Sequence, residues 1–248
     1  MPTKLVGTAW METASDGWFA DLNNDGLEDL AVGRLPVATL GEATALVTKI
    51  VAYDHTSAAR KVLLVADAND SENDFEAASA RMRAALPPTV TVTELLRGTL
   101  GDPATQTQFA SQLSLGQTLA NYLGHGTVDA WHGGVLTAAE AAALANSRFP
   151  FVVSMTCLTG YFQDPNQHSL AQALLAAPGG AVAVWASSGL TELPAQAPID
   201  EALLQRLFPA SGPGPTLGEA TRAAKAASPN TDVRTTWTLF GDPSARLK

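Results

Sequence analysis

The chain has 248 residues, of which 46% are hydrophobic and 16% are charged, with a formal net charge of −9 and a single cysteine. This composition suits a globular domain with a sizeable core and excludes a disordered chain, an intramolecular disulfide and, in practice, a thiolate zinc site. The negative charge argues against non-specific nucleic-acid binding, and no apolar run of about 18 residues predicts a membrane span.

The first patterned stretch, residues 21–29, is acidic and has the spacing of a calcium loop. Oxygen ligands stand at positions 1, 3, 5, 7 and 9, namely the side chains of Asp21, Asn23, Asp25 and Asp29 and the carbonyl of Leu27. Gly26 at position 6 permits the sharp turn. A strand rather than a helix should follow, so the stretch is not an EF-hand. We expect a structural Ca²⁺ here; the alternative is an acidic Asn-Asp-Gly turn.

From about residue 28, apolar strands alternate with amphipathic helices. We expect strands at 29–35, 61–66, 89–94, 117–123, 149–155, 180–186 and 234–239. We expect helices at about 43–51, after a capping box at 39–42, and at 74–86, 103–113, 168–176 and 198–207. Two further capping boxes, at 137–140 and 216–219, predict two more helices. This alternation predicts an α/β fold in which a mostly parallel sheet is covered on both faces. Ligands of such folds bind at the carboxyl ends of the strands.

A histidine and the lone cysteine follow two of the predicted strands. His125 comes directly after the strand 117–123, and Cys157 after the strand 149–155. Because parallel strands end at the same edge, both side chains can reach one crevice, where a base and a thiol form a cysteine nucleophile. Gly126 can bring its backbone N–H close to a developing oxyanion. The alternatives are that Cys157 is a small buried hydrophobic residue and that Gly126 only permits a turn.

The other histidines fit this role less well. His132 lies seven residues beyond His125 in a glycine-rich loop, so strand geometry does not hold it. His55 ends an amphipathic helix and should be solvated, and His168 opens a helix. We therefore favour His125 as the base.

Several segments resemble the gingipain-type cysteine peptidases, peptidase family C25. The matching segments occur in the family's order and cover nearly the whole chain, at residues 15–21, 32–36, 122–126, 156–160, 180–184 and 237–243. The resemblance implies a caspase-like three-layer α/β/α sandwich, over residues 1–248, with an N-terminal segment 1–36 and a catalytic core 37–248. It also implies a His–Cys dyad that cleaves peptide or protein substrates, commonly after a basic residue, and a secreted or surface location. Family members usually carry a propeptide and flanking domains, and we expect such parts to be missing from this chain.

An acidic loop follows the strand 61–66 at the same edge as the dyad. Asp67 or Asp70 could orient His125, as the third residue of a triad does. Asp74 could line the S1 pocket and pair with a basic P1 residue, with Glu192 and Asp200 as rivals. The alternative is a solvated loop in which Asp74 caps the next helix.

The sequence therefore predicts a cysteine endopeptidase that works through an acyl-enzyme, with a preference for Arg or Lys at P1 and no organic cofactor. One alternative is a catalytically silent caspase-like scaffold module of a secretion or surface system. Another is a calcium-dependent surface module in which the thiol is inert. A Cys–His acyltransferase is also compatible with the residues, because an acyl-enzyme partitions between water and an amine.

Overall fold

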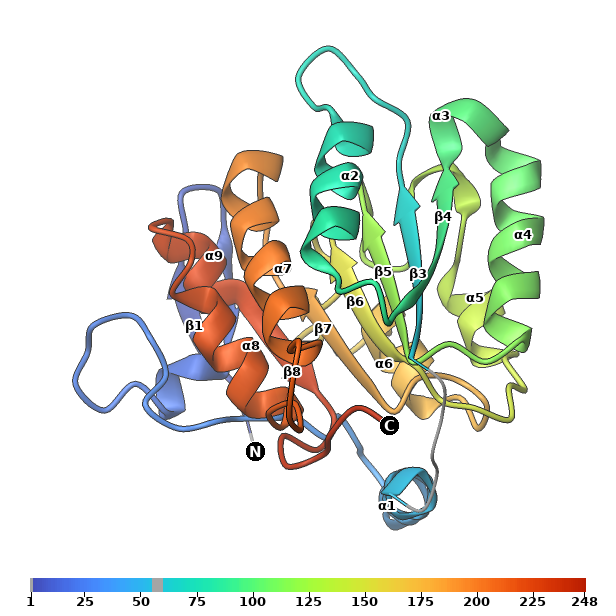
Figure 1. Cartoon of the computed structure of the whole chain (residues 1–248). Helices are drawn as coiled ribbons and strands as arrows, with labels where there is room; N and C mark the ends of the chain where they lie inside the picture. The colour runs from blue at the N-terminus through green and yellow to red at the C-terminus, as the bar shows by residue number, and fades with distance from the viewer. Residues whose placement is uncertain (1, 55–59) are drawn as a thin grey trace.

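The computed structural model describes residues 2–54 and 60–248, so the prediction for His55 lies outside the described residues. A six-stranded sheet in the order β4-β3-β5-β6-β7-β8 forms its centre (Figure 1). Its strands are β3 (Lys61–Ala66), β4 (Thr91–Leu96), β5 (Leu119–Leu123), β6 (Phe151–Met155), β7 (Ala183–Ser187) and β8 (Trp237–Phe240). Only the β7–β8 pair is antiparallel. The sequence-based prediction of a mostly parallel sheet is confirmed.

Helices cover the sheet on both faces and complete the three-layer sandwich (Figure 1). One face is covered by α2 (Phe75–Ala85), α7 (Leu193–Leu207) and α8 (Leu217–Lys225). The other is covered by α1 (Leu40–Asp54), α4 (Asp102–Ser114), α5 (Ala138–Ala142) and α6 (Leu170–Ala176). Two short helices, α3 (Arg97–Leu100) and α9 (Thr231–Thr236), precede α4 and β8. No helix of the described residues is both long and apolar enough to cross a bilayer.

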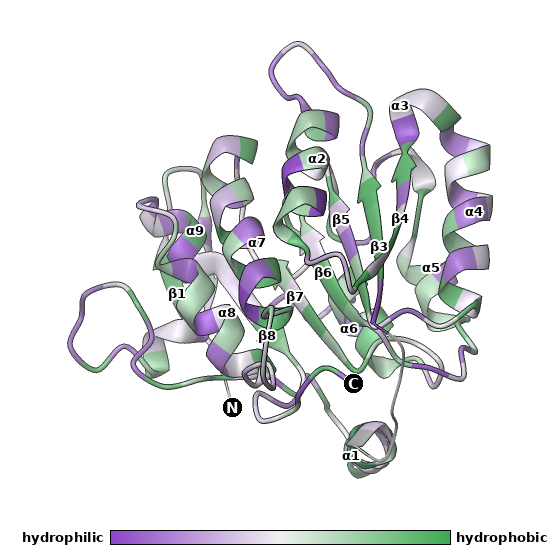
Figure 2. Ribbon diagram, viewed as in Figure 1, coloured by the Kyte–Doolittle hydropathy of each residue, from purple (hydrophilic) through white to green (hydrophobic). Residues whose placement is uncertain are grey.

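Strand β3 explains why these strands read as continuous apolar runs. Val62 and Leu64 pack into the core on the α2 and α7 side. Leu63 and Val65 pack into the core on the α4 and α6 side. Successive side chains of a strand point to opposite faces, so a sheet covered on both faces buries every position. Figure 2 shows the resulting hydrophobic strands between helices with mixed faces.

One strand prediction is wrong, and a second is correct only over residues 237–239. Residues 29–35 form no strand; Arg34 alone makes an isolated bridge to Phe240, and its side chain forms an ion pair with Asp16. Residues 231–236 are helical, because the side chain of Asn230 caps the first turn by accepting from the Val233 amide. Strand β8 therefore begins only at Trp237.

The N-terminal segment forms a hairpin that the sequence patterns did not predict. Strand β1 (Lys4–Gly7) pairs antiparallel with β2 (Glu12–Ser15). A 3₁₀ turn, η1 (Gly17–Phe19), follows, and a second one, η2 (His132–Gly134), precedes α5. The hairpin contacts α9, which places it beside the β8 edge of the sandwich (Figure 1).

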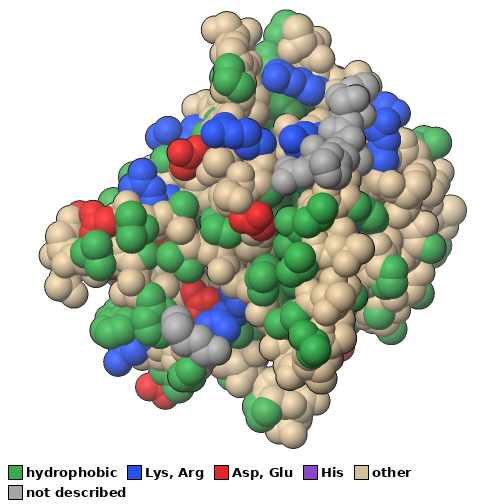
Figure 3. All heavy atoms as spheres, turned by 90° about the horizontal axis from the view of Figure 1, so that it is seen from below, with side chains coloured by type: hydrophobic (Ala, Val, Ile, Leu, Met, Phe, Trp, Pro, Cys, Tyr) green, Lys and Arg blue, Asp and Glu red, His purple; other side chains and the backbone are tan. Residues whose placement is uncertain are grey.

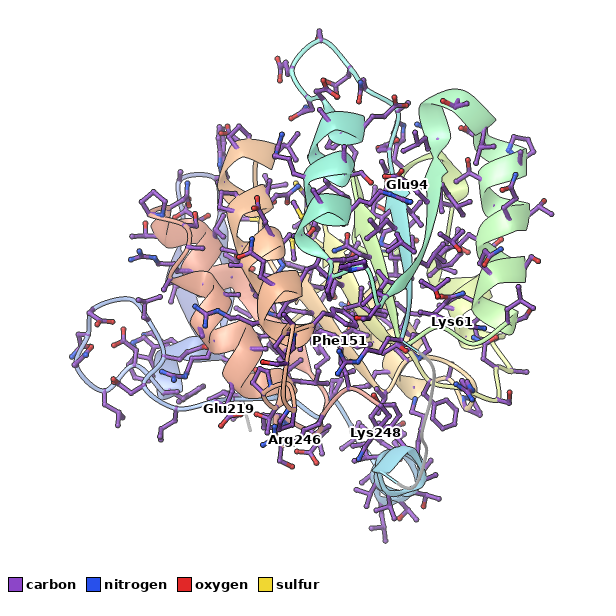
Figure 4. The ribbon with its side chains drawn as sticks, viewed as in Figure 1. Lys61, Glu94, Phe151, Glu219, Arg246 and Lys248 are labelled. Atoms are coloured by element: carbon purple, nitrogen blue, oxygen red, sulfur yellow. The ribbon has the colours of Figure 1, made fainter. Side chains whose placement is uncertain are left out.

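Several basic side chains lie at the amino-terminal ends of the strands. Figure 3 shows Lys and Arg side chains on the face at the amino-terminal ends of the strands. A hollow of about 290 Å³ on that face is lined by Arg60, Arg246 and Lys248, the last two of which are labelled in Figure 4. The acidic loop 67–76 lies at the opposite, carboxyl-terminal edge, where the dyad was predicted.

Candidate active site

His125 and Cys157 occupy equivalent positions on neighbouring strands. Leu123 of β5 pairs with Met155 of β6, and each of the two residues follows its strand two positions later. The Gly124 amide donates to the Met155 carbonyl at 3.1 Å and extends the pairing toward the two side chains. Both line one cavity of about 310 Å³, together with Glu72, Asn73, Phe75, Gly124, Thr191, Glu192, Leu193, Pro194 and Gln196. The structure therefore brings the predicted base and the predicted nucleophile to a common cavity.

The sheet order explains why the cavity forms at this edge. From β3 the chain continues to β4 on one side and then returns to β5 on the other. The loops after β3 and β5 consequently diverge in opposite directions, and this divergence opens a crevice at the carboxyl ends of the strands. The acidic loop after β3 and His125 after β5 form its two sides.

The Cys157 thiol is half-buried and touches Thr191, a residue that the sequence analysis did not identify. The Thr191 amide donates to its Sγ at 3.3 Å, and Sγ lies 3.4 Å from the Thr191 carbonyl. Thr191 is held in turn by Gln196, whose amide group donates to the Met155 carbonyl at 3.2 Å. The signal for this residue was the Ser-Ser-Gly stretch between an apolar strand and a helix, which marks a loop at the same sheet edge.

The residue after the cysteine is held in an unusual conformation. Leu158 has a φ of 59°, a left-handed conformation that side chains other than Gly, Asn and Asp rarely adopt. Its amide donates to the Gly189 carbonyl at 3.0 Å, and the Thr159 amide donates to the Cys157 carbonyl at 2.7 Å. These bonds fix a sharp turn directly after β6. The turn leads the chain away from the cavity and leaves the thiol at its wall.

The His125 ring is half-exposed and contacts an acid. Its Nε2 lies 2.7 Å from Asp70 Oδ2, and its ring meets Phe75 edge to face at a centroid distance of 5.1 Å. The hydrogen bond to the His125 ring is the main reason that the pKa of Asp70 lies below its ordinary value. Because Asp70 accepts from Nε2, the other ring nitrogen, Nδ1, is the one that remains to act as a base.

Asp67 supports His125 by accepting a hydrogen bond from the backbone amide of His125, whereas Asp70 contacts the imidazole ring. Its fully buried carboxylate accepts the His125 amide at 3.0 Å and the Arg97 guanidinium at 2.6 Å. Burial acts to raise the pKa of Asp67, but these hydrogen bonds outweigh it and lower the pKa. The Tyr122 hydroxyl donates to the His125 carbonyl at 2.8 Å, so both backbone groups of His125 are held. The two candidate orienting acids thus differ: Asp70 contacts the ring, and Asp67 anchors the main chain.

The other two described histidines, His132 and His168, do not line the catalytic cavity, and of the two glycines that flank His125 only Gly124 lines it. His132 Nδ1 lies 3.1 Å from Asp67 Oδ2 and its ring packs 5.9 Å from that of His125, so it belongs to the support of His125. His168 is exposed ahead of α6. Gly124 lines the cavity, whereas Gly126 packs against Thr156, where an added Cβ would come within 2.5 Å of the hydroxyl oxygen.

The three candidate S1 acids lie in different places. Asp74 caps α2, accepting the Ala77 amide at 2.9 Å, and lines a separate cavity. Asp200 is fully buried, accepts from Asn121 at 2.6 Å, and has its pKa raised to about 7 by burial. Glu192 is exposed and lines the cavity of His125 and Cys157. Of the three, the structure brings only Glu192 into the cavity with the dyad.

The acidic loop 21–29 is closed by its own amides. Asp21 accepts from the amides of Asp25 and Gly26 at 3.1 and 2.9 Å, and Asp29 accepts from the Leu22 amide at 2.8 Å. Among the residues that the structure describes, no three His, Cys, Asp or Glu side chains converge on one point. A carboxylate has about four lone-pair sites, so one that accepts an amide retains others for an ion. A structural Ca²⁺ held by Asp21, Asn23, Asp25, Asp29 and the Leu27 carbonyl stays a proposal.

Removal of calcium tests that proposal. If the loop binds Ca²⁺, a chelator lowers the melting temperature, because an ion that binds only the folded state stabilises it. Asp21→Asn should make the protein insensitive to the chelator. The control is Asp164→Asn, a loop carboxylate that likewise accepts a backbone amide, which should leave the calcium response intact. Differential scanning calorimetry with and without Ca²⁺ measures this, and an unchanged wild-type melting temperature contradicts the site.

A mostly parallel sheet that delivers a histidine and a cysteine to one cavity is the arrangement expected of a caspase-like cysteine peptidase domain. The model of peptidase family C25 matches residues 2–248, and the chain therefore belongs to this family. Among curated protein sequences, no match was found.

Solved structures show the same fold. The chain is similar to the Arg-specific cysteine proteinase gingipain R (RgpB), with 20% identity and a TM-score of 0.85, covering 100% of this chain and 62% of that one. A complex of the Porphyromonas gingivalis RgpB pro- and mature domains gives 21% identity and a TM-score of 0.84, with coverages of 100% and 63%. The Saccharomyces cerevisiae separase–securin complex matches at 11% identity and a TM-score of 0.61, covering 86% of this chain and 14% of that one. The chain thus spans less than two thirds of the gingipain chains that it matches.

Proposed function

We propose that this chain is a cysteine endopeptidase whose nucleophile is Cys157 and whose base is His125. The observation that carries the proposal is that these two side chains, at equivalent positions after β5 and β6, line the same cavity. Membership of peptidase family C25 supports it. The silent scaffold and the calcium-dependent surface module have no comparable observation in their favour.

The mechanism follows from the surroundings of each group. His125 takes the thiol proton on Nδ1, and Asp70 stabilises the resulting imidazolium through Nε2–H. The Cys157 thiolate attacks the scissile carbonyl, and the amides of Gly126 and Cys157 stabilise the oxyanion. The imidazolium then protonates the leaving amine as the C–N bond breaks. Water, activated by His125, hydrolyses the thioester and restores the thiol.

We also propose that the peptidase prefers a basic P1 residue and that Glu192 contributes to this preference. The cavity is lined by two carboxylates, Glu72 and Glu192, and its lining includes neither Lys nor Arg among the described residues. Glu192 adjoins Thr191, which bonds the Cys157 thiol, and it lines the cavity that holds this thiol, so a P1 side chain in the cavity can reach it. A guanidinium that enters this cavity can form a charge-assisted hydrogen bond with the carboxylate.

Substrates that differ only at P1 test this preference. The wild type should cleave Arg substrates faster than Leu or Asp substrates, and Glu192→Gln should lower kcat/KM for Arg by about tenfold to a hundredfold. Cleavage of the Leu substrate should be little changed. The matched control is Glu201→Gln, nine residues along the chain on α7 and outside this cavity. Equal turnover of the three substrates by the wild type would refute the preference.

The domain is further proposed to act on peptides or proteins outside the producing cell, together with a pro-segment or flanking domains. The support is the family, together with the structure of RgpB as a complex of pro- and mature domains. Fractionation of producing cells tests the location: the proposal expects the protein in the medium or at the surface, and an exclusively intracellular pool contradicts it.

A further inference from the structure

A second cavity opens beside the catalytic one. Its volume is about 130 Å³, and it is lined by Ala9, Trp10, Leu190, Thr191, Glu192, Ala195, Asn230, Asp232 and Val233. Thr191 and Glu192 line both cavities, so the two hollows lie on either side of this short segment. Thr191 also bonds the Cys157 thiol. A polypeptide whose scissile bond lies at Cys157 therefore passes within reach of the second cavity.

One wall of this cavity is an exposed indole. The side chain of Trp10 is 59% exposed at the tip of the β1–β2 hairpin. A single exposed aromatic side chain is ordinary on a protein surface, and what distinguishes Trp10 is that it lines a cavity adjoining the catalytic one. Nothing in the core of the described residues requires Trp10 at this place, because its ring does not contribute to either buried cluster.

The hairpin that carries Trp10 is anchored to the segment that leads into the catalytic cavity. Thr13 donates to the Ser188 carbonyl, and the Ser188 hydroxyl donates to the Ala14 carbonyl, both at 2.6 Å and both buried. At the tip, the Ala9 amide donates to Asp232 Oδ2 at 2.8 Å. These bonds fix the hairpin relative to residues 188–192. The backbone that carries the indole is consequently in place before a ligand binds, which reduces the ordering that binding requires.

The charge of the cavity selects the ligand. Glu192 and Asp232 both line it, and its lining includes no Lys or Arg among the described residues. A cationic side chain can stack on the face of Trp10 and approach these carboxylates at the same time. An Arg guanidinium is well suited, because it is planar, weakly hydrated and always charged.

We propose that Trp10 and Asp232 form a substrate subsite for a second basic residue, adjacent to P1. The substrates of this peptidase are then polypeptides with paired basic residues at the cleavage point. This inference rests on the proposed peptidase function and names its substrate class. Trp10 acts here by binding the substrate, and it takes no part in the chemistry.

Two series of peptide substrates test the subsite. All carry Arg at P1, and they carry Arg, Ala, Leu or Glu at P2 in one series and at P1′ in the other. In the series whose varied position occupies the subsite, whether P2 or P1′, Arg should raise kcat/KM about fivefold to tenfold over Ala in the wild type. Trp10→Ala should abolish this gain, Trp10→Phe should retain much of it, and Asp232→Asn should reduce it. The matched control is Trp18→Ala, since Trp18 is 50% exposed but lines a different hollow.

The outcomes separate the subsite from the peptidase function. If Arg gives no gain in either series, if Leu gives the greater gain, or if the gain survives in Trp10→Ala, the subsite is refuted while the peptidase stands. Binding of the same peptides to Cys157→Ala, measured by calorimetry, gives a readout that needs no turnover. An inactive wild type combined with Trp10-dependent binding of the Arg peptide would overturn the peptidase and support the subsite.

Discussion

Cys157→Ala and His125→Ala should each lower kcat by about 10⁴-fold or more, and the double variant should be no worse than either single variant. The reason is that the thiolate and its base act as one unit, so the loss of either removes the same covalent route. The measurement is the initial rate on a fluorogenic peptide with Arg at P1. Circular dichroism spectra and melting temperatures should show that both variants remain folded.

The other histidines serve as controls for this result. His132→Ala should lower kcat by no more than about tenfold, because the His132 ring contacts Asp67, Arg97 and the His125 ring and does not line the catalytic cavity. His168→Ala should have no effect, since His168 is exposed ahead of α6. If His132→Ala abolished turnover and His125→Ala did not, the assignment of the base would be wrong.

Arg97→Ala should destabilise the fold by about 3 to 5 kcal/mol, the usual consequence of leaving one member of a buried ion pair without its partner. The Asp67 carboxylate is fully buried, and the Arg97 side chain is 12% exposed. The same variant should lower kcat, because Asp67 also holds the His125 amide. Chemical denaturation measures the first effect, and peptide hydrolysis well below the new melting temperature measures the second.

The matched control is Arg83→Ala, which removes an exposed ion pair to Glu94 at 4.0 Å and should change stability by less than about 1 kcal/mol. The effect of Arg97→Ala should also depend on pH. The folded-state pKa of Asp67 is lowered, so its contribution is present above the unfolded pKa of about 3.9 and is lost as the pH falls through the folded pKa. The difference in the free energy of unfolding between wild type and Arg97→Ala should therefore decrease in acid. A difference that stayed constant with pH would contradict this role of Asp67.

The parts of the fold that follow a strong local pattern could be predicted from the sequence. Strand β3 was predicted at its observed bounds, because a parallel strand buried on both faces gives a continuous apolar run. The capping box at Thr137 was predicted because its two hydrogen bonds involve only neighbouring residues. The β1–β2 hairpin was missed, because its stability depends on distant partners such as Ser188. A single sequence does not reveal such partners.

The same difference between local patterns and contacts with distant residues applies to the candidate site. His125 and Cys157 could be placed together because strand ends in a parallel sheet share an edge. The choice between Asp67 and Asp70 could not be made, because it depends on which loop atoms turn toward the ring and which toward the backbone. Thr191 was missed, since nothing in its neighbours identifies a residue that bonds a thiol. Glu192 was one of three S1 candidates, and only the packing of α7 distinguishes it from the buried Asp200.

The most direct test of the account is covalent labelling with a peptidyl chloromethyl ketone that carries Arg at P1, followed by peptide mass spectrometry. Cys157 is the only cysteine in the chain, so the modified residue can be identified without ambiguity. We expect one adduct, on the peptide that contains Cys157, with loss of activity in proportion to labelling and much slower labelling in His125→Ala. An active enzyme whose Cys157 stays unmodified, or is modified equally fast without His125, would contradict this expectation.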